Sequence, residues 1–324
     1  MSQVEPLTLN TNNKYTIFPI KYHDIYNFAL KHKEAIWFTN EIDMAGDIDD
    51  WGKLGDNEKY FIKHVLAFFA ASDGIIMENL STNFCNEIQV AEVRQFYSVQ
   101  MFMESEHNLT YSTLIETYID NSDERIQLFN AIENFPAIRR KASWAAKWIT
   151  SDASLAKRLV AVLFVENIFF SGAFCAIYFI GEMGIMKGLC SSNRFIARDE
   201  GMHCDFAVLL YTKYIVNKLS QDEITELITE AVDIEKEFIN ESLPCALLGM
   251  NAAMMSQYIE YVAHRVVSQL GYISPYISAK CPFGFMDKIC LQNQSSFFDV
   301  RVTEYKKDVR AQKSKLAVNF DADF

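Results

Sequence analysis

Two copies of one spacing, a glutamate followed three residues later by a histidine, constrain the fold of this chain more than any other feature. Glu104 precedes His107, and Glu200 precedes His203. On a helix, residues three apart lie on one face with Cβ atoms about 5–6 Å apart, so a carboxylate and an imidazole at this spacing can bind one metal ion together. The sequence therefore predicts two helices that each present one metal-binding pair.

A single acidic residue inside an apolar segment precedes each pair. Asp73 lies 31 residues before Glu104, and Glu166 lies 34 residues before Glu200. Neither acid has Lys or Arg within one helical turn, and as ordinary core residues they would be costly, unpaired buried charges. One carboxylate from each of two helices, with an E-x-x-H pair from each of two others, is the ligand set of ferritin-like di-iron bundles. The prediction is an all-α, ferritin-like di-iron bundle with additional helices.

The predicted site is electrically balanced when it holds two metal ions. Four carboxylates neutralise two Fe²⁺, and two Fe³⁺ with one oxo bridge again sum to zero with four carboxylates. Oxygen ligands with one imidazole for each metal suit Fe or Mn, and these ligands do not separate the two metals. The six predicted ligands are Asp73, Glu104, His107, Glu166, Glu200 and His203.

The rest of the sequence has the composition of a long-helix protein. Gly and Pro number only 12 and 6 among 324 residues, and half of the residues are apolar. Few helix breakers and many apolar residues favour long helices over short strands. Helical periodicity predicts helices within segments 60–80, 90–118, 143–149, 159–180, 194–219, 221–243 and 251–270.

Segment 159–180 is apolar and long enough to span a bilayer. Glu166 and Asn167 interrupt it, and the sequence offers no second span to accompany it. A helix that is apolar on every side is also typical of the centre of a large soluble bundle. We therefore expect a buried helix and no membrane partner.

The net charge and the cysteine content limit which binding partners and which cellular compartment are expected. The formal net charge of −12 disfavours nonspecific binding to nucleic acid or to anionic membranes. The seven cysteines are odd in number and form no C-x-x-C pair, so neither a disulfide framework nor a cysteine zinc site is expected. The first 13 residues are polar and lack the apolar region of a signal peptide. The sequence predicts a cytoplasmic protein that binds no nucleic acid.

Three regions are predicted along the chain: an N-terminal arm over 1–20, the di-iron helical domain over 21–285 and a flexible tail over 286–324. Frayed termini are common, but two Phe and two acids at the very end favour a docking peptide. Its residues are Asn319, Phe320, Asp321, Ala322, Asp323 and Phe324.

Tyr111 follows His107 by four residues, so one helical turn places it beside the metals. Phe170, Phe174 and Ile196 are in helical register with other ligands, and we expect them to face the same site and exclude water from it. A core tyrosine with a satisfied hydroxyl is the ordinary alternative. The register with His107 favours a redox role.

These residues resemble the small, radical-generating (beta) subunit of class I ribonucleotide reductase, in its eukaryotic and large DNA-virus form. The resemblance runs from about residue 38 to the C-terminus. It is carried by HVLAFFAASDGI at 64–75, ESEHNLTY at 104–111, VENIFFSG at 165–172, RDEGMHCDFA at 198–207 and the final FDADF.

The resemblance implies a ribonucleoside-diphosphate reductase that is active only with a separate large subunit. Its di-iron site would react with O₂ and oxidise Tyr111 to a tyrosyl radical, which the large subunit would use to make deoxyribonucleotides. Trp37, Asp199 and His107 would form a relay from the metals toward the surface, and Tyr305 would continue that relay in the tail. The resemblance also implies that residues 319–324 dock into the large subunit and that the small subunit is a homodimer.

Two other functions fit the ligand set. A different di-iron oxidase or hydroxylase would act on its own substrate, but it would have no need of Tyr305 or of a terminal docking peptide. A non-catalytic iron store or structural subunit would have no need of Tyr111 or Trp37. A family variant that uses Mn/Fe has Phe in place of the radical tyrosine, and Tyr111 argues against it.

Overall fold

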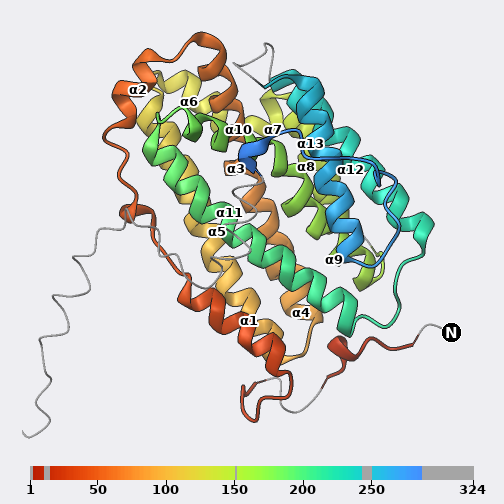
Figure 1. Ribbon diagram of the computed structural model, residues 1–324. Helices are drawn as coiled ribbons and strands as arrows, with labels where there is room; N and C mark the ends of the chain where they lie inside the picture. The colour runs from red at the N-terminus through yellow and green to blue at the C-terminus, as the bar shows by residue number, and fades with distance from the viewer. Residues whose placement is uncertain (1–2, 11–14, 150–151, 243–249, 287–324) are drawn as a thin grey trace, which may run out of the picture.

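The computed structural model describes residues 3–10, 15–149, 152–242 and 250–286, and within these residues the chain is helical and contains no strand (Figure 1). The prediction of an all-α fold is confirmed. The longest helices are α3 (Asp56–Asn79), α5 (Ala91–Tyr118), α11 (Lys187–Leu209), α12 (Gln221–Ser242) and α13 (Ala252–Gln269). The other helices are α1 (His23–Glu34), α2 (Asp47–Lys53), α4 (Cys85–Glu87), α6 (Ser122–Phe129), α7 (Ala131–Asn134), α8 (Pro136–Ile149), α9 (Leu155–Phe164) and α10 (Ser171–Glu182).

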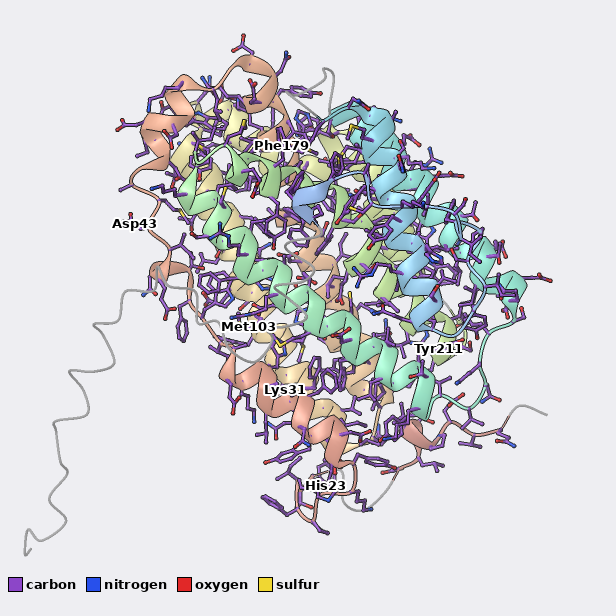
Figure 2. All side chains as sticks on the ribbon, in the orientation of Figure 1. His23, Lys31, Asp43, Met103, Phe179 and Tyr211 are labelled. Atoms are coloured by element: carbon purple, nitrogen blue, oxygen red, sulfur yellow. The ribbon has the colours of Figure 1, made fainter. Side chains whose placement is uncertain are left out.

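The long helices pack side by side around one apolar core. α3 packs along α5, α1 also packs on α5, and α12 packs on α13. Side chains fill the space between the helices, and the fully buried Met103 of α5 lies in the interior of the bundle (Figure 2). The predicted N-terminal arm has one short 3₁₀ turn at Pro6–Thr8 in its described part. The predicted boundaries at 20 and 285 stay predictions.

Three of the long helical rods contain a π-helical turn, in which the backbone is wound more widely than in an α-helix. These turns are Leu80–Phe84 after α3, Val165–Phe169 between α9 and α10, and Leu210–Tyr214 after α11. A π-turn redirects the side chains of its helix and is frequent at functional sites. The turn Val165–Phe169 carries one of the predicted metal ligands, Glu166.

The starts of several helices follow from capping residues in the sequence. Ser220 and Glu223 form a capping box at the start of α12, because the Glu223 carboxylate accepts the Ser220 N–H at 2.9 Å and the Ser220 hydroxyl accepts the Glu223 N–H at 3.3 Å. Asn251 caps α13 by accepting the Met254 N–H at 2.9 Å. The predicted helices at 221–243 and 251–270 accordingly match the structure closely.

Other predicted helix bounds are wrong by several residues. α8 begins at Pro136 rather than 143, since proline is well tolerated in the first turn of a helix. The helix predicted to reach 219 ends at Tyr214, where the Ile215 N–H closes the π-turn on the Leu210 carbonyl at 3.0 Å and Ile215 turns extended. Hydrophobic periodicity alone does not register such an ending, because Ile215 and Leu219 are both apolar and buried.

Among the described residues, two helical rods are long and apolar enough to cross a membrane by length and composition, Asp56–Glu87 and Leu155–Glu182. The expectation of a single such segment is therefore wrong. The apolar window of Leu155–Glu182 is 94% buried and that of Asp56–Glu87 is 61% buried. Core helices of a bundle have this character, and the prediction that segment 159–180 is buried is confirmed.

An ion pair in the core joins two helices to the π-turn that carries Glu166. Lys141 Nζ on α8 lies 2.7 Å from a carboxylate oxygen of Glu235 on α12, and both side chains are fully buried. The same ammonium donates to the Phe169 carbonyl at 2.6 Å and lies 3.3 Å from the centre of the Phe68 ring. Burial lowers the pKa of Lys141 to about 8 and raises the pKa of Glu235 to about 7. These shifts occur even though each side chain stabilises the charged form of the other.

We expect Lys141→Met to lower the free energy of unfolding by about 3–5 kcal/mol, because it leaves the buried Glu235 without its counter-charge. The double variant Lys141→Met/Glu235→Leu should recover most of this loss, since it removes both charges and keeps apolar volume. Denaturant unfolding followed by circular dichroism measures both changes. Equal losses in the single and the double variant would show that the ion pair is not the cause.

Candidate metal centre

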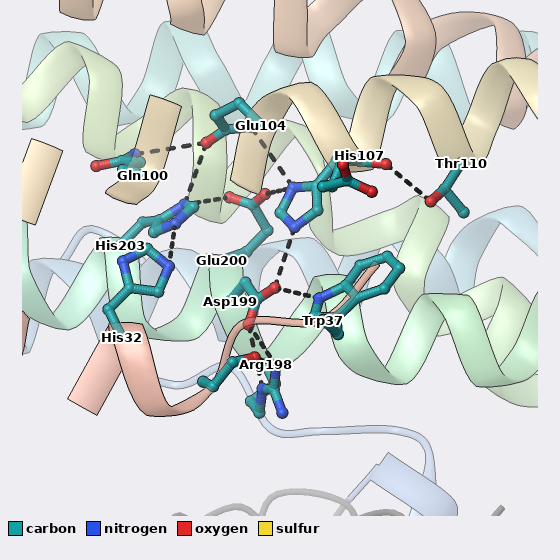
Figure 3. A network of polar contacts seen from close by, with 12 residues as sticks. His32, Trp37, Gln100, Glu104, His107, Thr110, Arg198, Asp199, Glu200 and His203 are labelled. Carbon is teal, nitrogen blue, oxygen red and sulfur yellow. Dashed lines mark hydrogen bonds and ion pairs between the residues drawn. The ribbon is translucent and has the colours of Figure 1, made fainter. Parts of the chain in front are cut away.

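The structure brings the six predicted metal ligands together at the centre of the bundle. Figure 3 shows Glu104, His107, Glu200 and His203 among them. At most 3% of each of these residues is exposed. They come from four helical rods: Asp73 from α3, Glu104 and His107 from α5, Glu166 from the π-turn Val165–Phe169, and Glu200 and His203 from α11.

The ligand atoms form two groups that share Glu104. Within each group, one ligand atom from every residue lies within 4.8 Å of the others. Two adjacent groups with a shared carboxylate are the arrangement that a pair of metal ions requires. The groups are Asp73, Glu104 and His107, and Glu104, Glu166, Glu200 and His203.

Glu104 and Glu200 each lie between the two histidines. The two oxygens of Glu104 are 3.6 Å from His107 Nδ1 and 3.2 Å from His203 Nδ1. The two oxygens of Glu200 are 3.2 Å from His107 Nδ1 and 3.3 Å from His203 Nδ1. Both Nδ1 atoms therefore point at the same two carboxylates. Glu104 and Glu200 could therefore each contribute to both metal positions, while Asp73 and Glu166 would each contribute to one.

The protonation of the cluster reflects four acids crowded in a dry site. Burial raises the pKa of Asp73 and of Glu166 well above the usual range, and repulsion from neighbouring carboxylates adds to the effect. Burial would lower the pKa of His107 and of His203, but their carboxylate contacts outweigh it and raise both pKa values well above the usual range. Glu104 has its pKa lowered to about 2, because its close contacts with both histidines outweigh burial.

Several buried polar atoms of the cluster form no hydrogen bond with any described residue. They include both carboxylate oxygens of Asp73, one oxygen each of Glu104 and Glu200, and Nδ1 of His107. Buried polar atoms are normally hydrogen-bonded, so a convergent set without such partners calls for another explanation. The donor set of four carboxylates and two imidazoles fits two Fe or Mn ions, which would satisfy all of these atoms.

The three predicted relay residues form one continuous chain of contacts. Asp199 Oδ2 accepts the Trp37 Nε1–H at 2.7 Å and lies 3.2 Å from Nε2 of the ligand His107. Arg198 donates to the other oxygen of Asp199 at 2.9 Å and 3.1 Å. Burial would raise the pKa of Asp199, but Arg198 and then His107 outweigh it and lower that pKa. Asp199 is therefore an anionic acceptor that fixes the ring of His107.

Tyr111 is fully buried on α5, and its hydroxyl forms no hydrogen bond with the described residues. Its ring stacks on Phe69 with ring centres 4.6 Å apart, and Phe69 in turn contacts Phe170 and Phe174 at 5.2 Å and 5.0 Å. Burial raises the pKa of Tyr111 well above its usual value, and the charge of Asp73 is the next cause. Ile196, the third predicted pocket residue, is fully buried on α11.

Sequence reasoning missed three residues that contact this centre. Phe69 contacts Tyr111 and both of the predicted phenylalanines. Gln100 donates to Glu166 at 2.9 Å, and its position one helical turn before Glu104 was a usable signal. His32 on α1 lies 3.3 Å from His203, and burial lowers its pKa to about 3. No motif marks His32 in the sequence.

The predicted tail residues lie outside the described part of the chain. Tyr305 and the proposed docking residues Asn319–Phe324 all follow residue 286. Their predicted roles rest on the sequence alone.

A bundle of long helices that encloses four carboxylates and two histidines defines a class, the ferritin-like carboxylate proteins. The family model for the small chain of ribonucleotide reductase matches residues 14–282. The ribonucleoside-diphosphate reductase small chain of Trypanosoma brucei brucei is 51% identical over 322 residues, which cover 99% of this chain and 95% of the relative. The small chain of Vaccinia virus (strain Ankara) is 47% identical over 321 residues, covering 99% of this chain and 100% of the relative.

Solved structures agree with the sequence comparisons. The ribonucleotide reductase Rnr4 homodimer from Saccharomyces cerevisiae is 34% identical with a TM-score of 0.80, and the match covers 90% of this chain and 93% of that one. The R2 subunit from Clostridium botulinum, at 21% identity and a TM-score of 0.76, shares the fold. The predicted ferritin-like bundle is thus confirmed. This chain belongs to the ribonucleotide reductase small-chain family.

Proposed function

We propose that this chain is the small subunit of a ribonucleoside-diphosphate reductase and that its di-iron centre generates a radical on Tyr111. The large subunit would use this radical to make deoxyribonucleotides. The observation that carries the proposal is a complete set of six buried ligands beside a buried tyrosine, in a chain of this family. An independent oxidase or an iron store would not explain both the membership of this family and the buried Tyr111 beside the ligands.

The metal pair would supply the reduction of O₂ and the oxidation of Tyr111. The chain's own residues prepare that tyrosine. Its raised pKa keeps the phenol protonated at rest, so oxidation must remove a proton together with the electron. Phe69 covers its ring and, with Phe170 and Phe174, keeps water away from the oxidised side chain.

Electron and proton transfer between the metal centre and the protein surface would pass through Trp37, Asp199 and His107. The hydrogen bond between Trp37 and Asp199 gives this path continuity. Trp37 also stacks on the Phe195 ring at 5.2 Å, which holds the indole in place. We propose that Tyr305 continues the path toward the large subunit.

The test is to add Fe²⁺ and then O₂ to the metal-free chain, followed by metal analysis and electron paramagnetic resonance. We expect about two irons per chain and the signal of a tyrosyl radical, by analogy with two-metal carboxylate sites. Loading with Mn²⁺ in parallel distinguishes the two metals that suit these ligands. Two bound irons with no organic radical would contradict the proposed role of Tyr111.

Metal binding should release protons, and its affinity should rise with pH. The metal-free cluster holds protons on His107 and His203, and the raised pKa values of Asp73 and Glu166 favour their protonated forms. A metal ion must displace these protons before it binds. Isothermal titration calorimetry with Fe²⁺ under anaerobic conditions, in buffers of different ionisation enthalpy, counts the protons released. The range from about pH 6 to about pH 8 spans the ordinary histidine pKa. An affinity that does not change across this range would contradict the expectation.

We propose that residues 319–324 dock into the large subunit, with Phe side chains in apolar pockets and acids against a basic rim. A synthetic peptide of these six residues should then inhibit turnover by competition. A matched peptide with Ala at both Phe320 and Phe324 should inhibit far less. Equal inhibition by the two peptides would remove the phenylalanines from the docking role.

We also propose a homodimer and a cytoplasmic location. The related structure from Saccharomyces cerevisiae is a homodimer. The cysteines that the structure describes as free thiols suit a reducing compartment. They are Cys85, Cys175, Cys190 and Cys204.

A further inference from the structure

A third histidine lies against the cluster from a helix that carries none of the six ligands. His32 is fully buried in the last turn of α1. Its Nε2 is 3.3 Å from Nε2 of His203, and the two rings meet edge-on with centres 4.9 Å apart. Figure 3 shows His32 on the side of the His203 ring that faces away from Glu104 and Glu200.

The contacts of His203 decide which of the two rings donates the hydrogen bond. His203 Nδ1 faces Glu104 and Glu200 at 3.2 Å and 3.3 Å, so Nδ1 is the nitrogen that would bind a metal ion once its proton is displaced. The ring would then be neutral and carry its single proton on Nε2. In that state His203 Nε2–H would donate to His32 Nε2.

The two candidate ligand histidines consequently have different outer partners. His107 contacts Asp199, a carboxylate that Trp37 and Arg198 also hold. His203 contacts His32, a ring with no carboxylate in hydrogen-bond contact among the described residues. Metal-binding histidines usually direct their outer N–H at a carboxylate, a carbonyl or water, and that acceptor fixes the tautomer and the ring orientation. At His203 an imidazole takes this place.

Hydrogen bonds at both ends of α1 hold His32 in position beside His203. At its start, Asp24 accepts the Tyr214 hydroxyl at 2.6 Å, and Tyr214 belongs to the π-turn that follows α11. At its end, the Ala35 carbonyl accepts a hydrogen bond from Arg198 of α11 at 2.6 Å. Since α11 also carries His203, both anchors keep His32 at a fixed distance from the ring that it contacts.

We propose that His32 is a positioning residue for one of the two metal ions. It accepts the outer N–H of His203, selects the tautomer with a free Nδ1, and aims that nitrogen between Glu104 and Glu200. The inference rests on the proposed metal centre. Although α1 supplies no ligand, it would then directly influence the metal position that His203 completes. It would have little influence on the metal position that His107 completes.

The experiment is an anaerobic Fe²⁺ titration of the metal-free full-length chain against a competing chelator. In His32→Ala, we expect one of the two bound irons to bind about 10–100-fold more weakly, the usual effect of losing an outer partner of a metal ligand. The other iron should keep its affinity. His32→Gln, whose amide oxygen can accept the same N–H, should recover most of the loss. His23→Ala, an exposed histidine on the same helix, is the matched control and should have no effect.

The possible results separate this inference from the proposed function. Two irons of unchanged affinity in His32→Ala would overturn the role of His32 and leave the metal centre intact. Equal weakening of both irons in His32→Ala and in His32→Gln would also overturn it, because a general packing defect acts in that way. A wild-type chain that binds no iron would overturn the metal centre and the role of His32 together. Thermal unfolding of the metal-free variants reports any packing defect independently of iron.

Discussion

Glu104→Ala should abolish the binding of both metal ions, although it removes only one of six candidate ligands. Glu104 belongs to both groups of ligand atoms, and its two oxygens face different histidines. Its removal leaves each metal position short of one carboxylate and the site short of one negative charge. We expect the iron bound per chain to fall from about two to near zero.

Asp73→Ala is the matched comparison, because Asp73 belongs to one group only. This variant should keep about one iron per chain, at the position that His203 completes. Glu116→Ala, an exposed position on the same helix as Glu104, should keep both irons. Colorimetric iron analysis after anaerobic loading and desalting measures all three variants. Two irons retained in Glu104→Ala would show that the shared-carboxylate arrangement does not hold the metals.

The sequence was sufficient to predict the candidate ligands because helical spacing is a local property. Residues three apart share a helix face wherever that helix packs, so Glu104 with His107 could be paired without knowledge of the fold. The lone acids Asp73 and Glu166 were recognisable because an unpaired charge in an apolar helix needs a partner from elsewhere. The structure places these residues at one point, as the spacing predicted.

The outer partners depend on contacts that no local pattern records. His32 and His203 are 171 residues apart, and their contact exists only because α1 packs against the bundle beside α11. Lys141 and Glu235 likewise meet across two helices, and either residue read alone looks like part of an ordinary charged face. Predicting such pairs requires the packing of the helices, which hydrophobic periodicity leaves undetermined.

The π-turns show a second limit of sequence reasoning. Segment Val165–Phe169 lies inside one long, mostly apolar stretch of sequence, so composition does not reveal where the winding changes. The structure ties the change to tertiary contacts. The Phe169 carbonyl accepts the Lys141 ammonium, and the α-helical bonding of α10 resumes with the Phe174 N–H on the Phe170 carbonyl. Glu166 reaches the cluster from this altered winding.

Tyr111→Phe should bind two irons normally and yet form no tyrosyl radical and support no turnover with the large subunit. The substitution removes one oxygen from a fully buried side chain and leaves the ring that stacks on Phe69. Because the hydroxyl forms no hydrogen bond with the described residues, its loss leaves no partner unsatisfied, and stability should change by less than about 1 kcal/mol. Any loss of activity therefore reports on chemistry and not on folding.

Tyr97→Phe is the matched control for this experiment. Tyr97 is also buried on α5, its hydroxyl also has no hydrogen bond with the described residues, and burial also raises its pKa. It lies ten residues before His107 and stacks on Phe84, away from the aromatic group that surrounds Tyr111. Electron paramagnetic resonance after iron and O₂ loading, together with the rate of deoxyribonucleotide formation, should separate the two variants. A radical and turnover that survive in Tyr111→Phe but vanish in Tyr97→Phe would reassign the radical to Tyr97, which is buried near another carboxylate of the cluster, Glu166.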